Sequence, residues 1–253
     1  MRIVNWNAER PRVKSPKNKL RVRHLLDLAP DIAIVTETST AVDLGQDYIG
    51  LFTEHSPRKP RVGEAVAAIW VRRETFSVVS APVTSDPGEA VCAELESGGV
   101  RFVVYGSIIP YKDAKGPEGT SKQWEEHKKA IEWHQRDWLK LRESFPEHLL
   151  IAAGDYNQHR DGIGVYGTAE TRSMLSRAMT DAGLTCVTEA DFVAAVGLSR
   201  RNIDHVCLSA DLAAAVTGVH AWEGTVASRC LSDHNGITVE LDDALIGNRS
   251  AGQ

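Results

Sequence analysis

Polar side chains that could do chemistry stand at the ends of apolar runs in this chain. They are Asn7, Glu37, Gly154-Asp155-Tyr156-Asn157, Asp204 and Ser232-Asp233-His234-Asn235. Loops carried by a rigid sheet commonly hold catalytic groups. Carboxylate and carboxamide oxygens are the ligands that Mg²⁺ and Mn²⁺ prefer, and a histidine can transfer a proton. The pattern predicts a hard-metal site beside a proton-transfer group if the chain brings these segments together.

Each segment taken alone has a plain structural explanation. Asn7 and the Gly-Asp-x-Asn segment could form turns, and Ser232-Asp233 could cap a helix. Glu37 could be a solvated strand end, and a lone His234 is more often structural than catalytic. His205, directly after Asp204, is expected to pack within its strand. The functional hypothesis therefore depends on all the segments occurring together.

The elements that must position these residues are mostly short strands. We expect helices over 17–28, 121–144 and 170–182, and Pro30 ends the first because its ring is incompatible with a helix interior. Trp124, Trp133 and Trp138 are expected to lie in the core beneath the second helix. Many short strands with few helices predict two packed sheets with helices outside them. The expected strands are 2–6, 31–36, 47–52, 65–71, 76–80, 90–95, 100–106, 148–153, 184–188, 203–208, 215–222 and 235–241.

The same polar segments, in this order, resemble the motifs of the endonuclease/exonuclease/phosphatase family. The resemblance covers the chain from Asn7 to His234, and the pair of Gly-Asp-x-Asn and Ser-Asp-His motifs is fairly specific. It implies a four-layer α/β/β/α sandwich of two mainly antiparallel sheets flanked by helices. It also implies a phosphodiesterase that uses Mg²⁺ or Mn²⁺ and an activated water. The expected partner is nucleic acid, which the basic segments favour, or another phosphodiester substrate.

The resemblance assigns roles to the matching positions. Glu37 would be the principal metal ligand, assisted by Asn7 and Asp233. Asp155 would orient or deprotonate the attacking water, and Asn157 would donate a hydrogen bond to the phosphate. His234, polarised by Asp204, would stabilise the charged transition state. Asn7 is counted with the catalytic group as well as with the metal ligands.

The chain departs from the family pattern at two places. Many relatives carry a Tyr or His shortly before the proline that follows the central strand, where this chain has Ser107 and Ile108 before Pro110. Tyr111 could substitute from the other side of that proline. The segment 197–202 lacks the Trp that is usual in abasic-site enzymes, and no aromatic-rich hairpin suggests a lipid substrate.

Charge is unevenly distributed along the chain. The net charge is −5, although the segment 8–23 alone carries +6 and the remainder −11. Such a segment could bind a polyanion or could be a solvated face. Arg58, Lys59 and Arg61 in segment 54–64, the loop 111–122 and Arg200 could extend a basic rim. The residues that we expect to contact substrate are Arg10, Lys14, Tyr111, Lys112 and Arg201.

Several further expectations follow from the composition. Residues 1–246 are expected to form one domain, with a disordered tail over 247–253. No apolar run is long enough for a membrane span or a signal peptide, so a cytoplasmic protein is expected. Widely spaced Cys92, Cys186, Cys207 and Cys230 argue against a zinc site and favour buried free thiols. The alternatives to a nuclease are a small-molecule or phosphomonoester phosphatase and a non-catalytic nucleic-acid-binding scaffold.

Overall fold

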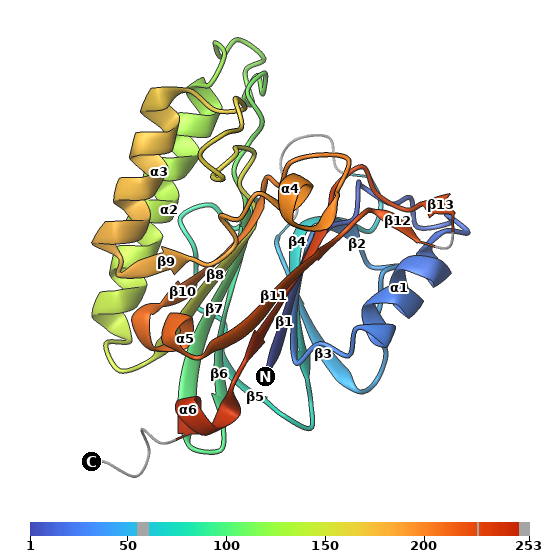
Figure 1. Ribbon diagram of the computed structural model, residues 1–253, viewed down its shortest axis with the longest axis vertical. Helices are drawn as coiled ribbons and strands as arrows, with labels where there is room; N and C mark the ends of the chain where they lie inside the picture. The colour runs from blue at the N-terminus through green and yellow to red at the C-terminus, as the bar shows by residue number, and fades with distance from the viewer. Residues whose placement is uncertain (55–60, 227, 248–253) are drawn as a thin grey trace.

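Two six-stranded sheets lie face to face between outer layers of helices in the computed structural model (Figure 1). The structure describes residues 1–54, 61–226 and 228–247. The expected disordered tail lies almost entirely outside these residues, and so do Arg58 and Lys59. The expected four-layer α/β/β/α sandwich is confirmed.

The first sheet joins the two ends of the chain. Its strand order is β11-β14-β1-β2-β4-β3. β1 and β2 are parallel and connected through helix α1 (Asn18–Asp27), whereas every other neighbouring pair is antiparallel. The strands are β1 (Arg2–Asn7), β2 (Ile32–Ser39), β3 (Tyr48–Phe52), β4 (Glu64–Arg72), β11 (Val216–Trp222) and β14 (Gly236–Leu241).

The second sheet has the order β5-β6-β7-β8-β10-β9 and also contains one parallel pair. β7 and β8 are parallel and connected through the long helix α2 (Glu125–Ser144), with α3 (Ala169–Asp181) beside it. Parallel neighbours require such a crossover, because a tight turn can join only antiparallel strands. The strands are β5 (Ser77–Ser80), β6 (Ala90–Ser97), β7 (Val100–Ile108), β8 (Leu149–Asp155), β9 (Leu184–Cys186) and β10 (Asp204–Ser209).

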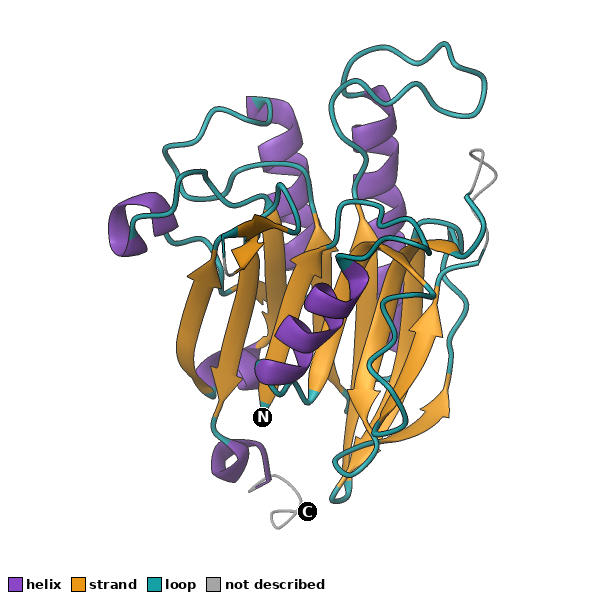
Figure 2. Cartoon of the chain, turned by 90° about the vertical axis from the view of Figure 1, so that its right-hand side faces the viewer, coloured by secondary structure: helices purple, strands orange, loops and turns teal. Residues whose placement is uncertain are grey.

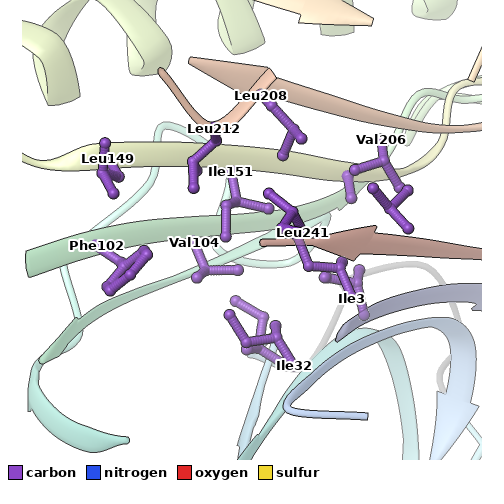
Figure 3. Close-up of a cluster of buried hydrophobic side chains, with 14 of the residues drawn as sticks. Ile3, Ile32, Phe102, Val104, Leu149, Ile151, Val206, Leu208, Leu212 and Leu241 are labelled. Atoms are coloured by element: carbon purple, nitrogen blue, oxygen red, sulfur yellow. The ribbon is translucent and has the colours of Figure 1, made fainter. Parts of the chain in front are cut away.

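Three apolar layers hold the sandwich together. Ile3, Ile32, Val104 and Ile151 belong to the cluster between the two sheets (Figure 3). A second cluster, which includes Trp138, lies between the second sheet and helices α2 and α3, and a third lies between the first sheet and α1. Because side chains alternate along a strand, β1 places its odd-numbered residues toward the other sheet and its even-numbered ones toward α1.

The expected strands and long helices are all present, with ends that differ by a few residues. The short elements were not predicted, because one or two turns carry too few residues to show a hydrophobic period. Helix α2 begins at Glu125 rather than 121, since Trp124 has a positive φ of 65°. The unpredicted elements are α4 (Phe192–Val196), α5 (Ala210–Ala214), α6 (Asp243–Gly247), β12 (Thr225–Val226) and β13 (Arg229–Cys230).

Two expectations about burial need correction. Trp138 is fully buried as expected, but Trp124 and Trp133 are only partly buried, because they lie near the end and at the flank of α2. All four cysteines are free thiols, and Cys92 and Cys207 are buried as expected, but Cys186 is only partly buried. Cys230 is exposed, because β13 belongs to a small two-stranded ribbon outside the core. Within the described residues, no helix has both the length and the apolar character needed to span a bilayer.

A buried asparagine connects the two sheets near one end of the sandwich. Asn5 of β1 is fully buried, and its amide nitrogen donates to the carbonyl oxygens of Gly154 at 3.1 Å and His205 at 3.2 Å. Gly154 and His205 are register partners on β8 and β10. One side chain therefore fixes the first sheet against two strands of the second, one residue away from Asp155 and Asp204.

Replacing Asn5 with Ala should lower the free energy of unfolding by about 1–3 kcal/mol, because two buried carbonyl groups lose their donor. Urea unfolding followed by tryptophan fluorescence would measure the change. Thr217→Ala, which removes a hydroxyl that donates to Glu240 at an exposed edge, is the control and should change stability little. An equal loss of unfolding free energy in the two variants would show that the hydrogen bonds from Asn5 between the sheets do not stabilise the fold.

Candidate active site

The direction of each strand brings the polar segments to one edge of the sandwich. Asn7 and Asp155 end strands β1 and β8, and Glu37 lies near the end of β2. β10 and β14 run the other way, so Asp204 begins β10 and His234 immediately precedes β14. This edge lies opposite the N-terminus (Figure 2). The sequence expectation that these segments converge agrees with the contacts that follow.

His234 and Asp204 form a buried ion pair at the centre of the site. Nδ1 of His234 lies 2.8 Å from Oδ2 of Asp204, whose side chain is 1% exposed. Burial by itself would lower the pKa of His234, but the charge and hydrogen bond of Asp204, followed by the charges of Asp155 and Asp233, raise that pKa to about 10. The imidazole is therefore a cation at neutral pH, with Nε2 facing away from Asp204.

Asp155 is the second buried carboxylate, and it lies on the far side of the imidazole. Its Oδ2 atom is 4.0 Å from Nε2 of His234. Burial, and then the charge of Asp204, raise the pKa of Asp155 well above its ordinary value, while His234 lowers it. Asp233 is more exposed, with Oδ1 3.8 Å from the same Nε2. One positive charge thus lies among three carboxylates.

Glu37 adds a fourth carboxylate and holds an unusual backbone conformation. Its φ of 44° is left-handed, which is uncommon for a residue without a special side chain. Hydrogen bonds from Ala8 N to Thr36 O and from Arg10 N to Glu37 O, both 2.8 Å, hold this turn against the end of β1. Burial raises the pKa of Glu37, whereas the charge of His234 and a hydrogen bond from Asn7 lower it. Strained residues of this kind cluster at functional sites.

Two asparagines orient the Asp155 carboxylate. Nδ2 of Asn7 donates to Asp155 Oδ2 at 3.0 Å, and Oδ1 of Asn7 accepts from Glu9 N at 2.8 Å. Nδ2 of Asn157 donates to the same Asp155 oxygen at 3.1 Å and to Ile109 O at 3.0 Å. Both amide hydrogens of Asn157 are therefore used within the protein. This arrangement suits a residue that holds Asp155 in place.

Cavities open on both sides of the buried carboxylates. The acidic cleft contains three glutamates and one arginine, and its other walls are mostly apolar. The histidine-side cavity contains His234 with two arginines, a tyrosine and a second histidine. The acidic cleft is lined by Arg10, Glu37, Glu64, Ala65, Val66, Glu89, Ile108, Pro110, Tyr111 and Asn157. The histidine-side cavity is lined by His159, Tyr166, Arg200, Arg201, Ile203, Asp204, Asp233, His234 and Asn235.

The residues expected to contact substrate lie in different surroundings. Arg10 lines the acidic cleft but forms an ion pair with Glu64. Arg201 lines the histidine-side cavity, and its Nη1 lies 2.6 Å from Asp161 and 3.2 Å from Asp191. Tyr111 lines the acidic cleft and is 55% exposed.

The two lysines lie outside both cavities. Nζ of Lys112 lies 3.9 Å from Asp113. Lys14 lines a separate surface hollow together with Val13 and Pro16. Lys14 is therefore not part of either cavity beside His234. Arg10 and Arg201 do line these cavities, but carboxylates neutralise both.

The position that many relatives fill with Tyr or His does not present a polar group to the site. Ile108 lines the acidic cleft, whereas Ser107 is fully buried and its Oγ lies 2.7 Å from Nε2 of His134 on α2. His205 is buried, with Nε2 3.0 Å from Gln158 O, and it packs within its strand as expected.

Two residues at the site were given no role in it from the sequence. Ser232 is buried, donates to Asn7 O at 2.6 Å and accepts from His234 N at 3.0 Å, so it connects the histidine loop to β1. Its place in the Ser-Asp-His motif was the available signal. Tyr166 lines the histidine-side cavity from a loop of mixed polarity, where no spacing or periodicity distinguished it.

Comparison with protein families decides which group of proteins shares this arrangement. A model of the endonuclease/exonuclease/phosphatase family matches residues 4–234, a range that includes every residue described above from Asn7 to His234. The chain belongs to this family. Members of the endonuclease/exonuclease/phosphatase family are hydrolases that act on phosphoesters, so a phosphodiesterase activity is supported.

Solved structures similar to this family member share its fold over nearly the whole chain. An endonuclease/exonuclease/phosphatase from Bacteroides vulgatus is 14% identical, with a TM-score of 0.69 and coverage of 95% of this chain and 98% of that one. The 3'-5' exonuclease NExo from Neisseria meningitidis is 19% identical, with a TM-score of 0.64 and coverage of 96% and 100%.

A third similar structure is the AP endonuclease LMAP from Leishmania major. It is 14% identical, with a TM-score of 0.67 and coverage of 94% of this chain and 86% of that one. At these identities the likeness establishes the fold. A comparison with curated protein sequences gave no match.

Replacing Asp204 with Asn should lower the pKa of His234 strongly in the metal-free protein, because burial then acts without the nearest compensating charge. NMR titration of the imidazole nitrogens would measure it. Asp233→Asn is the matched control, since Asp233 is more exposed and farther from the ring, so its loss should lower the pKa less. A His234 pKa that is unchanged by Asp204→Asn would rule out this ion pair as the cause.

Proposed function

We propose that the protein is a divalent-metal-dependent phosphodiesterase that cleaves nucleic acid with an activated water. One observation carries the proposal most directly. Asp155 Oδ2 and the cationic His234 Nε2 face each other across 4.0 Å, and Asn7 contacts both Asp155 and Glu37. A proton acceptor, a positive charge and a hard-ligand carboxylate thus surround one point. Together these three groups can catalyse phosphodiester hydrolysis.

The donor set fits a divalent cation of the Mg²⁺ or Mn²⁺ type. Glu37, Asp155 and Asp233 present oxygen atoms, and burial raises the pKa of Glu37 and Asp155, although the charge of His234 lowers both. Oδ1 of Asp204 is buried and has no hydrogen-bond partner among the described residues. A bound cation would lower the pKa values of Glu37 and Asp155 and so favour their ionised forms.

Glu37 would be the main ligand, with Asn7 and Asp233 beside it. Asp155, Asp204 and His234 also present ligand atoms within 4.8 Å of one another. We place the ion at Glu37 instead, because a protonated imidazole cannot coordinate metal. When bound, the ion would neutralise phosphate oxygens and the departing oxyanion.

The protein's own groups would handle the proton and the remaining charge. Asp155, held by Asn7 and Asn157, would accept the proton of the attacking water. His234 would direct its Nε2–H toward a phosphate oxygen and stabilise the charge that develops there. Asp204 would keep the imidazole protonated and fix its orientation through Nδ1.

The acidic lining of the cleft gives a reason to keep a second candidate, a phosphatase for small phosphoesters. Arg10 and Arg201 are paired with carboxylates, and strong nucleic-acid binding normally needs cations that can neutralise phosphates. Similarity to an exonuclease and an AP endonuclease supports the nucleic-acid candidate. A cleavage panel of DNA, RNA, abasic DNA and small phosphoesters with Mg²⁺ or Mn²⁺ would separate the two.

Asp155→Asn and His234→Ala should each lower turnover at least about 100-fold, since each removes a group that acts in the transition state. Steady-state assays on the best substrate of the panel would measure kcat. Asp181→Asn and His220→Ala change the same residue types at exposed positions and should leave kcat within about twofold. Full activity in either site variant would contradict the assigned roles.

Glu37→Gln should raise the metal concentration required for half-maximal activity by about tenfold or more, because a neutral amide is a weaker ligand than a carboxylate. Titration of Mg²⁺ and Mn²⁺ in the activity assay would measure this concentration. Glu132→Gln on the exposed face of α2 is the matched control. An unchanged half-saturating concentration, with reduced kcat alone, would place the ion elsewhere.

A further inference from the structure

Several hydrogen-bond donors beside the site are already engaged within the protein. Both amide hydrogens of Asn157 are already donated, to Asp155 and to Ile109. Arg10 and Arg201 form ion pairs with Glu64 and with two aspartates. A phosphate between the two cavities has non-bridging oxygens that need donors as negative charge develops.

Tyr166 brings a hydroxyl group to this position from the loop between β8 and α3. It lines the histidine-side cavity with Asp204 and His234. It is also close enough to Asp155 for the charge of that carboxylate to affect its phenol. Its side chain therefore shares a cavity with Asp204 and His234 and lies within electrostatic reach of Asp155.

The hydroxyl group can donate. Its oxygen accepts a hydrogen bond from Lys112 N at 3.3 Å, and no acceptor for its hydrogen is found in the described part of the chain. Burial, partly offset by the bond from Lys112, raises the pKa of Tyr166, with a further increase from Asp155. The phenol consequently stays protonated at neutral pH, as a donor to an anion must.

The ring is held in place by its surroundings. It packs against Trp124 at a centroid distance of 5.5 Å and against His159 at 6.0 Å. His159 N donates to Tyr166 O at 2.9 Å, and Tyr166 N donates to Nδ1 of His159 at 3.1 Å. Asp161 accepts from two amides of the same loop and pairs with Arg201. A donor fixed in this way needs little reorganisation when substrate binds.

We propose that Tyr166 donates its hydroxyl hydrogen to a non-bridging oxygen of the phosphate under attack, and so is a further catalytic residue of the proposed phosphodiesterase. The inference rests on the proposed function. It assigns this task to Tyr166 and not to Tyr111, which lies in the acidic cleft and is largely exposed. Ile108, in the cleft wall, has no polar group to offer.

Tyr166→Phe tests the proposal because it removes the hydroxyl and keeps the ring against Trp124. We expect kcat/KM to fall about 10- to 100-fold, the range for a hydrogen bond to a charged acceptor. The melting temperature should stay within a few degrees of wild type. Tyr48→Phe is the matched control, because it removes a hydroxyl that donates to Pro30 O at the opposite end of β2 from Glu37, and it should retain activity within about threefold.

Binding of inorganic phosphate, measured by calorimetry with Mg²⁺ present, gives a second readout that does not need turnover. Tyr166→Phe should weaken phosphate binding about tenfold, whereas Tyr48→Phe should not. If the wild type cleaves no phosphoester, the proposed function fails, yet the phosphate titration still decides the role of Tyr166.

Three results would overturn the inference. The first is a loss in kcat/KM below tenfold, or one that Tyr48→Phe shares. The second is phosphate binding that is equal in wild type and Tyr166→Phe, or absent from both. The third is a loss of activity in Tyr166→Phe accompanied by a fall in melting temperature of more than a few degrees. That result would make Tyr166 a structural residue of its loop.

Discussion

The buried pair of His234 and Asp204 is the interaction on which the site depends. Carboxylates do not normally collect in a protein interior, because each loses its hydration and repels its neighbours. Here Asp155, Asp204 and Asp233 surround one imidazole, which burial alone would leave neutral. Asp204 contributes most to keeping the ring protonated, with smaller contributions from Asp155 and the more exposed Asp233, and the ring in turn makes their proximity tolerable. The catalytic cation that we propose is therefore a consequence of how the carboxylates are buried.

That burial requires the two sheets to meet with their strand ends aligned. Each sheet contains one parallel pair with a helical crossover, β1-α1-β2 in the first and β7-α2-β8 in the second. Parallel strands send their carboxyl ends to the same edge, and the antiparallel β10 and β14 start there. Asn5 fixes the alignment by bonding one strand of the first sheet to two of the second. A shift of one residue would turn Asn7 and Asp155 away from each other.

Local sequence patterns predicted the strands and the strand-end position of the polar groups, because both depend on neighbouring residues. Alternation and β-branched runs define β1, β2, β7 and β8 without reference to the rest of the chain. The neutralisation of Arg10 by Glu64 and of Arg201 by Asp161 could not be predicted in this way. These partners lie 54 and 40 positions apart, and only the fold brings them together. Tyr166 was missed for the same reason.

The same electrostatics bear on which substrate the protein accepts. A positively charged N-terminal segment suggested a surface for a polyanion, yet the cleft beside Glu37 contains three glutamates and an arginine that is already paired. The histidine-side cavity is less negative than this cleft, because His234, Arg200 and Arg201 line it together with Asp204 and Asp233, although Arg201 is also paired with Asp161 and Asp191. If the phosphate under attack lies between the two cavities, the neighbouring phosphate groups of the substrate would then lie on the histidine side. The acidic cleft, with Val66, Ile108 and Tyr111 in its walls, is better suited to an uncharged, partly apolar portion of the substrate.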